Sequence, residues 1–253
     1  MLSPNYLLHI SEPAEEIAEQ LHIDIINRIV ERMMVRIGRG DNYLLTATDK
    51  WSIELLQDAG YLLENIQKEI AKRTKQQEAE IRDAMIDAGV RAIEYDNAIY
   101  EAAGLSPLPL MQSPYLMRLM ERNYQATLGE WRNYTRTTAN AAQQLFIQTV
   151  DKAYHMTASG AISYTQAVRE AVNEVVKDGV VIKYPSGRKD TIETATLRCV
   201  RTGIAQATAQ IQLARMKEMG VSLALVSSHM GARPTHEVFQ GKVFSIDWNT
   251  IDI

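Results

Sequence analysis

The stretch VSSHMGARPTHEVFQGKVF, residues 226–244, decides how the C-terminal part of this chain is expected to fold. An apolar run at residues 223–226 leads into it, and a second apolar pair, residues 243–244, ends it. Glycine permits backbone angles that are forbidden to other residues, and proline fixes one of those angles. The glycines and the proline between the two apolar runs therefore predict a structured loop that joins two short strands.

Seven residues of this segment are the candidate site residues. They combine ring nitrogens, a guanidinium group, an amide and special backbone positions, and they are His229, Gly231, Arg233, Pro234, His236, Gln240 and Gly241. We expect them to serve the fold of the loop or its contact with a partner. In that interpretation Arg233 ties the loop by hydrogen bonds from its planar donor fork, and the histidines pack and donate nearby.

The two histidines also raise the hypothesis of a hydrolase or metal-dependent enzyme centred on His229, Arg233 and His236. The histidines lie seven positions apart across glycine and proline, so no helix can place them on one face. A zinc site needs three or four ligands, and the nearest carboxylates are Glu237 and Asp247. We therefore predict no catalytic residue, no metal and no cofactor, with the enzyme kept as an alternative.

The segment resembles the signature of the phage minor capsid protein 2 family, which is related to the Mu F-type head morphogenesis proteins. That family has the same run of Ser, His, Gly-Ala-Arg-Pro, His and Gln-Gly-Lys. The similarity extends backwards and covers roughly residues 180–245. It includes Tyr184-Pro-Ser-Gly-Arg188, the positions Arg198, Val200 and Thr202-Gly203, and the stretches 205–208 and 212–220.

The resemblance implies a minor structural protein of a tailed-phage head that binds the portal vertex or the capsid interior. Its role would be to support head assembly, genome packaging or delivery, by binding and not by catalysis. The expected partners are the portal protein or the major capsid protein, and packaged DNA, with multiple copies in the virion after assembly in the host cytoplasm. Relatives commonly carry a further cysteine- and histidine-containing segment, which is not found before Ile253, so we expect no metal site completed in that way.

Composition limits the other function classes. The chain has 27 basic and 31 acidic residues and a formal charge of −4, which is not the electrostatic footprint of a nucleic-acid-binding protein. The single cysteine, Cys199, excludes a disulfide framework within the chain and is expected to be a small buried apolar residue. We find no signal peptide and no apolar run of about 18 residues, so we expect cytosolic synthesis and no membrane partner.

Residues 1–160 are predicted to be a long-helical region. After an irregular arm at residues 1–10, long helices are expected over residues 11–37, 51–103 and 114–157. The middle of the second, residues 71–80, is almost wholly polar and predicts an arm that reaches away from the core, or a kink between two helices. We expect the apolar stripes of these helices to dock on portal or capsid subunits.

The third long helix interleaves arginines with aromatic residues. Arg122, Trp131, Arg132 and Arg136 are therefore candidate nucleic-acid contacts, because such a mixture can stack on bases and neutralise phosphates. A DNA-guiding protein at the portal is the second alternative function. We favour a helix–helix interface in which the arginines extend their charged ends into water.

Residues 161–253 are predicted to form a small α+β module, with a boundary near residue 160. A capping box at Ser163 and Gln166 begins a short helix that ends at Gly179. A β-hairpin follows, with strands at 180–184 and up to Ile192 around a Pro-Ser-Gly turn, and then a helix over 194–219. The predicted fold class is mostly α, with long helices followed by a small α+β module that contains a β-hairpin.

Overall fold

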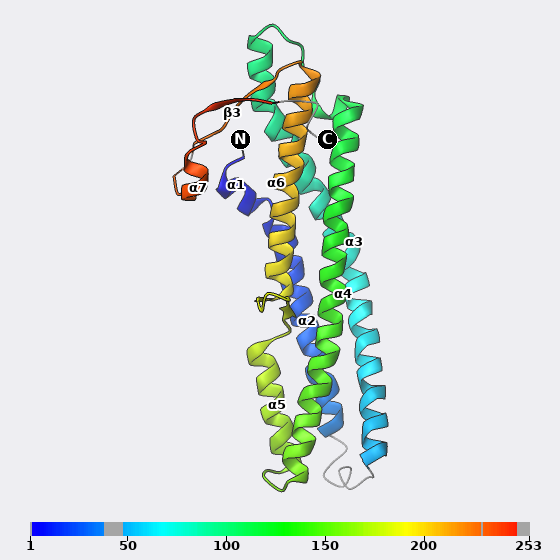
Figure 1. The fold of residues 1–253 in the computed structure, drawn as a ribbon. Helices are drawn as coiled ribbons and strands as arrows, with labels where there is room; N and C mark the ends of the chain where they lie inside the picture. Colours follow the sequence, from blue (N-terminus) through cyan, green and yellow to red (C-terminus); the bar gives the residue numbers. More distant parts are fainter. Residues whose placement is uncertain (1, 38–47, 229, 247–253) are drawn as a thin grey trace. The chain divides into compact units, whose positions relative to one another are not determined.

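The computed structural model describes residues 2–37, 48–228 and 230–246, and most of them are helical (Figure 1). The helices are α1 (Pro4–His9), α2 (Glu12–Ile37), α3 (Thr48–Ala102), the 3-10 helix η2 (Leu110–Gln112), α4 (Pro114–Ala158), α5 (Tyr164–Asp178), α6 (Ile192–Glu218) and α7 (Pro234–Glu237). The strands are β1 (Ile182–Lys183), β2 (Lys189–Asp190), β3 (Leu223–Leu225) and β4 (Val243–Ser245). The predicted fold class is confirmed.

Local sequence signals explain where the helices begin and end. The Ser163 hydroxyl accepts a hydrogen bond from the Gln166 backbone amide at 3.3 Å and caps the start of α5, as predicted. The Gln166 side chain does not complete the predicted capping box, because it donates to Glu170 at 3.2 Å. Gly179 ends that helix with a φ of 66°, a left-handed angle that favours glycine. At the start of α4, the Ser113 hydroxyl accepts from the Leu116 amide at 3.3 Å.

The prediction of an irregular arm at residues 1–10 is wrong, because residues 4–9 form helix α1. The Ser11 hydroxyl donates to the carbonyl oxygens of Leu7 and Leu8 at 3.0 and 2.8 Å. These bonds satisfy carbonyl groups that the end of a short helix leaves without a partner. A side chain beyond the helix thus stabilises a turn that periodicity alone did not indicate.

The chain divides into two compact units that are not continuous in sequence. Unit 1 comprises residues 1–3, 85–124 and 204–253, and unit 2 comprises residues 4–84 and 125–203. The division cuts through α3, α4 and α6. The domain boundary near residue 160 stays a prediction, since compactness does not say which segments fold independently.

Unit 2 is built from helices that lie side by side, with α2, the first part of α3, the second part of α4, and α5 (Figure 1). Their facing sides bury aliphatic residues and one large aromatic residue, Phe146, which is fully enclosed. The hairpin contributes Val180 to the same core, and the start of α6 contributes Ile192. Burial of this apolar surface is the main force that holds the unit together.

The polar middle of α3, residues 71–80, belongs to this packing. The prediction that it reaches away from the core as an arm is therefore wrong. Gln77 is completely buried, and its side-chain amide donates to the Ala14 carbonyl at 2.5 Å. Arg73 donates through Nε to Asp24 at 3.0 Å. A buried amide needs such a partner, because losing water without replacing its hydrogen bonds is costly. Helix α3 runs without interruption through this stretch.

Unit 1 has its own core, formed by the end of α3, the start of α4, the end of α6 and the connector between the first two. Leu110 of the connector packs with Ile93, Leu119 and Ile211. Arg215 is 1% exposed; it pairs with Glu218 at 3.0 Å and also donates to the Leu108 carbonyl. This buried guanidinium ties the proline-containing connector to α6.

The strands form two separate antiparallel pairs. In the first, Ile182 lies opposite Asp190 and Lys183 opposite Lys189. In the second, Leu223 lies opposite Ser245 and Leu225 opposite Val243. The first hairpin was predicted to continue to Ile192, but β2 ends at Asp190 because Ile192 already begins α6 and enters the core. Within the described ranges, no helix is both long and apolar enough to cross a bilayer.

Candidate functional site

The signature segment folds as the predicted strand, structured loop and strand. We call residues 221–246 the signature module. Beyond the paired residues of β3 and β4, the Val226 amide donates to the Lys242 carbonyl at 2.9 Å, and the Gly241 amide donates to the Val226 carbonyl at 2.8 Å. At the other end the Ile246 amide donates to the Ser222 carbonyl at 2.7 Å. Backbone bonds thus close the module along its whole length.

Glycine and proline shape the loop between the strands. Gly231 and Gly241 have φ angles of 82° and 69°, which other residues rarely adopt. Pro234 stands at the start of the short helix α7, where its fixed φ suits a first helical turn. The Arg233 carbonyl accepts from the amides of His236 and Glu237 at 2.7 and 3.0 Å. These positions therefore set the backbone path.

The expectation that Arg233 and the histidines tie the loop stays a prediction. Arg233 and His236 are exposed, and neither side chain has a hydrogen bond or ion pair to a described residue. Among the described residues, Arg233 contributes to the loop through its backbone carbonyl. His229 and Asp247 lie outside the described residues. Among the described residues, no three His, Cys, Asp or Glu side chains gather as a metal site would require.

The most unusual property of the signature module is its exposed apolar surface. None of its described residues is buried. Leu223, Leu225 and Val243 are 60%, 68% and 61% exposed. Alternate residues of a strand share a face, and Leu225 lies directly opposite Val243, so these three side chains form one face of the sheet. We call it the leucine face.

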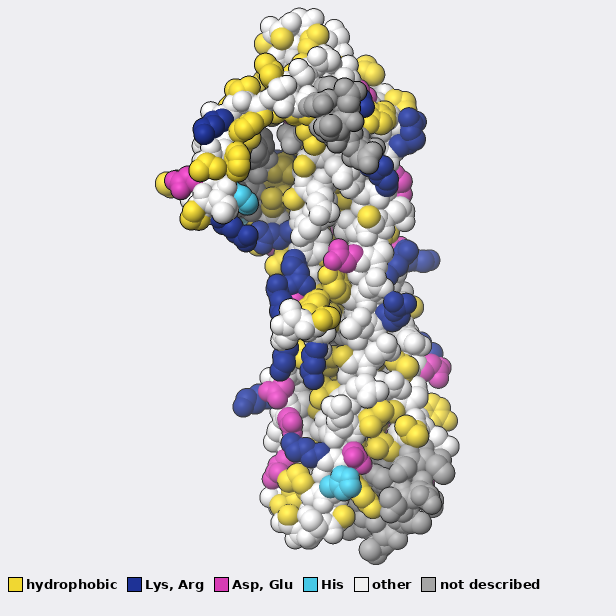
Figure 2. Space-filling model, viewed as in Figure 1, with side chains coloured by type: hydrophobic (Ala, Val, Ile, Leu, Met, Phe, Trp, Pro, Cys, Tyr) yellow, Lys and Arg dark blue, Asp and Glu magenta, His cyan; other side chains and the backbone are white. Residues whose placement is uncertain are grey.

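The signature module exposes further large apolar side chains outside the leucine face. They are at least 36% exposed, and they are Val226, Met230, Val238, Phe239 and Phe244. Phe239 and Phe244 touch, with ring centroids 6.0 Å apart. Figure 2 shows these yellow surfaces over the part of the molecule where Figure 1 draws β3 and α7. Phe244 lies opposite Ala224, on the other face of the sheet, so both faces expose apolar side chains. Large exposed apolar patches mark interaction sites in soluble proteins.

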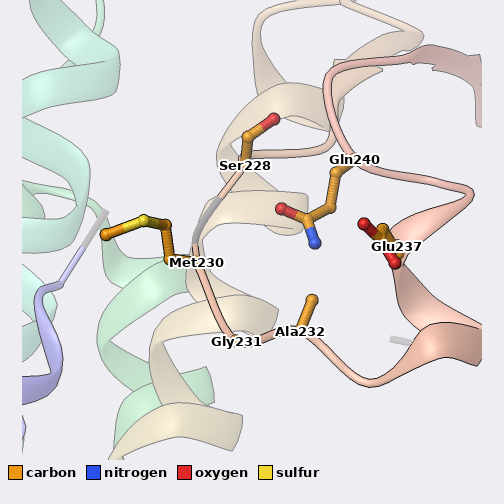
Figure 3. A pocket seen from close by; sticks show the side chains of 6 residues that line it. All are labelled: Ser228, Met230, Gly231, Ala232, Glu237 and Gln240. Atoms are coloured by element: carbon orange, nitrogen blue, oxygen red, sulfur yellow. The ribbon is translucent and has the colours of Figure 1, made fainter.

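The loop also borders an open hollow of about 620 Å³ (Figure 3). Its described lining residues are Ser228, Met230, Gly231, Ala232, Glu237 and Gln240. The side chains of Gln240 and Glu237 point into it, whereas Met230 extends away. The polar groups among these lining residues are one hydroxyl, one amide and one carboxylate, which can donate and accept hydrogen bonds.

The residues around 184–203 that share the family resemblance make contacts within the protein. Asp190 of β2 is 6% exposed and lies between two arginines, with Arg188 Nε at 2.9 Å and Arg198 Nη1 at 2.5 Å. Arg198 also donates to the Tyr184 hydroxyl at 2.8 Å and stacks over its ring. This cluster, which we call the Asp190 cluster, fastens the hairpin β1–β2 to α6.

Sequence reasoning missed Asp190. A signal was present, because it is the only carboxylate among the hairpin residues 180–190 and stands two positions from an arginine. The hairpin is also held from α2, where His22 accepts from the Val180 amide at 3.1 Å and contacts Glu193 at 2.9 Å. No local pattern could have indicated His22.

The shifted pKa values of Asp190 and Cys199 follow from burial and internal contacts. Burial acts to raise the pKa of Asp190, but hydrogen bonds from Arg188 and Arg198 outweigh it and hold that pKa below its ordinary value. Burial raises the pKa of the Cys199 thiol to about 12, so it is protonated and unreactive at neutral pH. The prediction that Cys199 is a small buried residue is confirmed, since it is 2% exposed.

Gly203 marks a close approach between α6 and α4. A Cβ at this position would overlap the Thr127 hydroxyl oxygen and lie 2.8 Å from its methyl carbon. Only glycine fits here without a shift of one helix. The Thr202-Gly203 pair in the resemblance thus has a packing explanation.

The four candidate nucleic-acid contacts on α4 differ in their availability. Trp131 is 1% exposed, so in this conformation its ring cannot stack on a base. Arg132 is exposed but pairs with Glu78 through Nε at 3.0 Å, and Arg136 donates to Asn133 at 2.8 Å. Arg122 is exposed and reaches Gln210 at 3.4 Å. Nucleic-acid contact by the three exposed arginines therefore stays a prediction, whereas the Trp131 ring is part of the core.

Comparison with known proteins gives one finding of similarity. The family model described as phage minor capsid protein 2 matches residues 2–250, nearly the whole chain. The match therefore includes both the long helices and the signature module. No curated protein and no solved structure shows a significant match.

Proposed function

Because this chain belongs to the phage minor capsid protein 2 family, we propose that it is a structural component of a tailed-phage head that binds the portal vertex or the capsid interior. Its contribution is to head assembly, genome packaging or delivery. The mechanism is docking of the signature module on a portal or major capsid subunit, with no chemical step. Virion components of this kind act in multiple copies after assembly in the host cytoplasm.

The exposure of the leucine face is the observation that carries this proposal. Leu223, Leu225 and Val243 each leave at least 60% of their surface in water. An isolated two-stranded hairpin is marginal in water, and burying apolar surface contributes about 25 cal/mol per Å². A partner that covers this face would stabilise the module and the contact together.

The long helices offer a weaker surface for docking than their apolar stripes predicted. Leu116 and Leu119 of α4 are buried in unit 1, and Phe146 and Val150 of the same helix are buried in unit 2. Those stripes hold the units together and are not exposed to a partner. The signature module is therefore the first candidate for docking.

Incorporation into particles tests the proposal. We would replace Leu223 and Leu225 by Gln in the phage genome and count this chain against the major capsid protein by quantitative mass spectrometry of purified particles. The matched control replaces Leu56 and Ile99, which are 64% and 55% exposed on α3, by Gln. We expect the wild type and the control in particles, and loss of the leucine-face variant.

Folding is checked in the same proteins by circular dichroism and urea unfolding, since an exposed substitution changes stability by only about 0.5 kcal/mol. Normal incorporation of a folded leucine-face variant would contradict docking through this face. Absence of the wild type from particles would contradict the structural role itself. A photo-cross-linking residue at Leu225 would then identify the partner as portal or major capsid protein.

A further inference from the structure

The hairpin β1–β2 places two positive charges directly opposite each other. Lys183 and Lys189 are register partners in the antiparallel pair, and both are exposed. Like charges at directly opposite positions destabilise a strand pair. Neither lysine forms an ion pair or side-chain hydrogen bond with any residue that the structure describes. The repulsion weakens the hairpin, and an anion that binds between the two lysines would relieve it.

The carboxylate nearest in sequence does not compensate these lysines. Adjacent residues of a strand point to opposite faces, so Asp190 faces away from Lys189. Asp190 is buried and engaged by Arg188 and Arg198. The exposed side of the hairpin therefore carries cations alone, and residues 180–190 have three basic groups against one acidic group in a chain whose formal charge is −4.

The tip of the hairpin is shaped for close approach by a broad surface. Pro185, Ser186 and Gly187 are exposed, uncharged and small. Gly187 has a φ of 82°, and open space surrounds the position where a Cβ would lie. Figure 2 shows dark blue side chains beside one another at the level where Figure 1 draws this hairpin, between α5 and α6.

We propose that this hairpin tip binds the phosphate backbone of double-stranded DNA, with Lys183, Lys189 and Arg188 each contacting a phosphate. Lysine is a compact charge on a flexible stem, which suits contact with phosphate. Contacts to phosphate carry no sequence information. Arg188 keeps a 55% exposed side chain while its Nε holds Asp190. The Tyr184 ring lies under Arg198 and adds no base stacking, so the contact is independent of sequence.

DNA is favoured over an acidic protein because the tip, residues 185–189, presents no exposed aromatic or large aliphatic side chain of the kind that anchors protein–protein contacts. The choice of DNA also rests on the proposed place of this chain in the virion, where the packaged genome is a dense polyanion. The proposal does not rest on docking of the signature module, which lies in another unit. The two are tested by different measurements on different residues.

Salt dependence gives the proposal a number. Each phosphate contact on duplex DNA contributes about 0.9 to the slope of log affinity against log salt. Three contacts predict an affinity loss of about 40-fold between 50 and 200 mM NaCl, and one contact a loss of about 3.5-fold. The contact is weak for a single chain, and many copies on one genome would add to it.

The experiment measures binding of the full chain to a 30-base-pair duplex DNA by fluorescence anisotropy at several salt concentrations. We expect Lys183→Gln with Lys189→Gln to weaken binding at 50 mM and to reduce the salt dependence to that of one contact. The control, Lys68→Gln with Lys72→Gln, removes the same charge from exposed positions on α3 and should keep the wild-type slope.

Absence of salt-dependent binding by the wild type would overturn the proposal, and so would an equal loss in both double variants. If the wild type does not bind DNA and the hairpin variant still impairs head assembly, the lysines serve an acidic protein surface and DNA is the wrong partner. Failure of this test leaves the particle-incorporation test of the leucine face unaffected, and the reverse also holds.

Discussion

The two hairpins of this protein share a topology but differ in their surroundings. Both are antiparallel pairs of short strands, and both belong to the stretch that resembles the family signature. In β1–β2, Ile182 is 3% exposed and Asp190 is 6% exposed, whereas in β3–β4 Leu225 and Val243 are more than 60% exposed. Family resemblance in the first hairpin has an internal explanation, and in the second it points to a partner.

The largest expected difference comes from equivalent apolar positions in the two hairpins. Ile182→Ala should lower the free energy of unfolding by about 2–5 kcal/mol, because it opens a cavity in a packed core. Leu225→Ala should change it by less than about 0.5 kcal/mol, since that side chain is already in water. Urea unfolding of the two variants measures both values, and similar losses would contradict the comparison.

A second experiment tests the Asp190 cluster. Asp190→Asn should cost about 1.5–3 kcal/mol, because hydrogen bonds from two arginines lose their charged acceptor. The control is Asp87→Asn, whose carboxylate pairs with Arg91 at 3.0 Å on an exposed helix face and should cost about 0.3–0.5 kcal/mol. Urea unfolding measures both losses. Equal losses of unfolding free energy in the two variants would show that the buried cluster stabilises the fold no more than an exposed ion pair does.

The helix that holds the first hairpin can be tested at its closest contact. Gly203→Ala should destabilise by about 1–3 kcal/mol through overlap with Thr127, and adding Thr127→Ala should recover part of that loss. Gly129→Ala on α4 has open space and should stabilise by about 0.4–1 kcal/mol. A double-mutant cycle by thermal unfolding checks the coupling, and purely additive effects would refute it.

The smallest expected effect is a change with pH. The pKa of Asp190 is lower in the folded chain than its ordinary value of 3.8, so the unfolded state binds its proton first. The stabilisation by Asp190 is therefore complete above that ordinary value and disappears as the pH falls through the folded pKa. Unfolding measured between pH 2 and 6 should show a shallower acid-side loss in Asp190→Asn, and an unchanged slope would contradict the cause given.

Much of the fold followed from local signals. The N-cap at Ser163, the left-handed Gly179 and the glycines of the signature segment placed helix ends and turns correctly. Those signals work because capping and glycine conformation depend on neighbours within a few residues. The short helix α1 was missed because its support comes from Ser11, a residue outside it.

The candidate site was less predictable than the fold. A strand at the apolar run of residues 223–226 was expected, and β3 covers residues 223–225. Which of its faces is covered depends on the rest of the chain, and alternation alone does not decide it. The sequence also placed Trp131 among nucleic-acid contacts, although the tertiary structure buries it. Conversely, no local pattern indicated that Lys183 and Lys189 lie opposite each other, because their pairing depends on the strand register.

Sequence alone determined the family of this protein, its helical character and the strand–loop–strand path of the signature module. Only the tertiary structure decided which residues are covered: it buried Gln77 against a carbonyl 63 positions away and joined His22 to Glu193 across 171 positions. It also left Leu225 in water. The physical reason is that backbone preferences act over a few residues, whereas burial is set by segments far apart in the chain that compete for the same contacts.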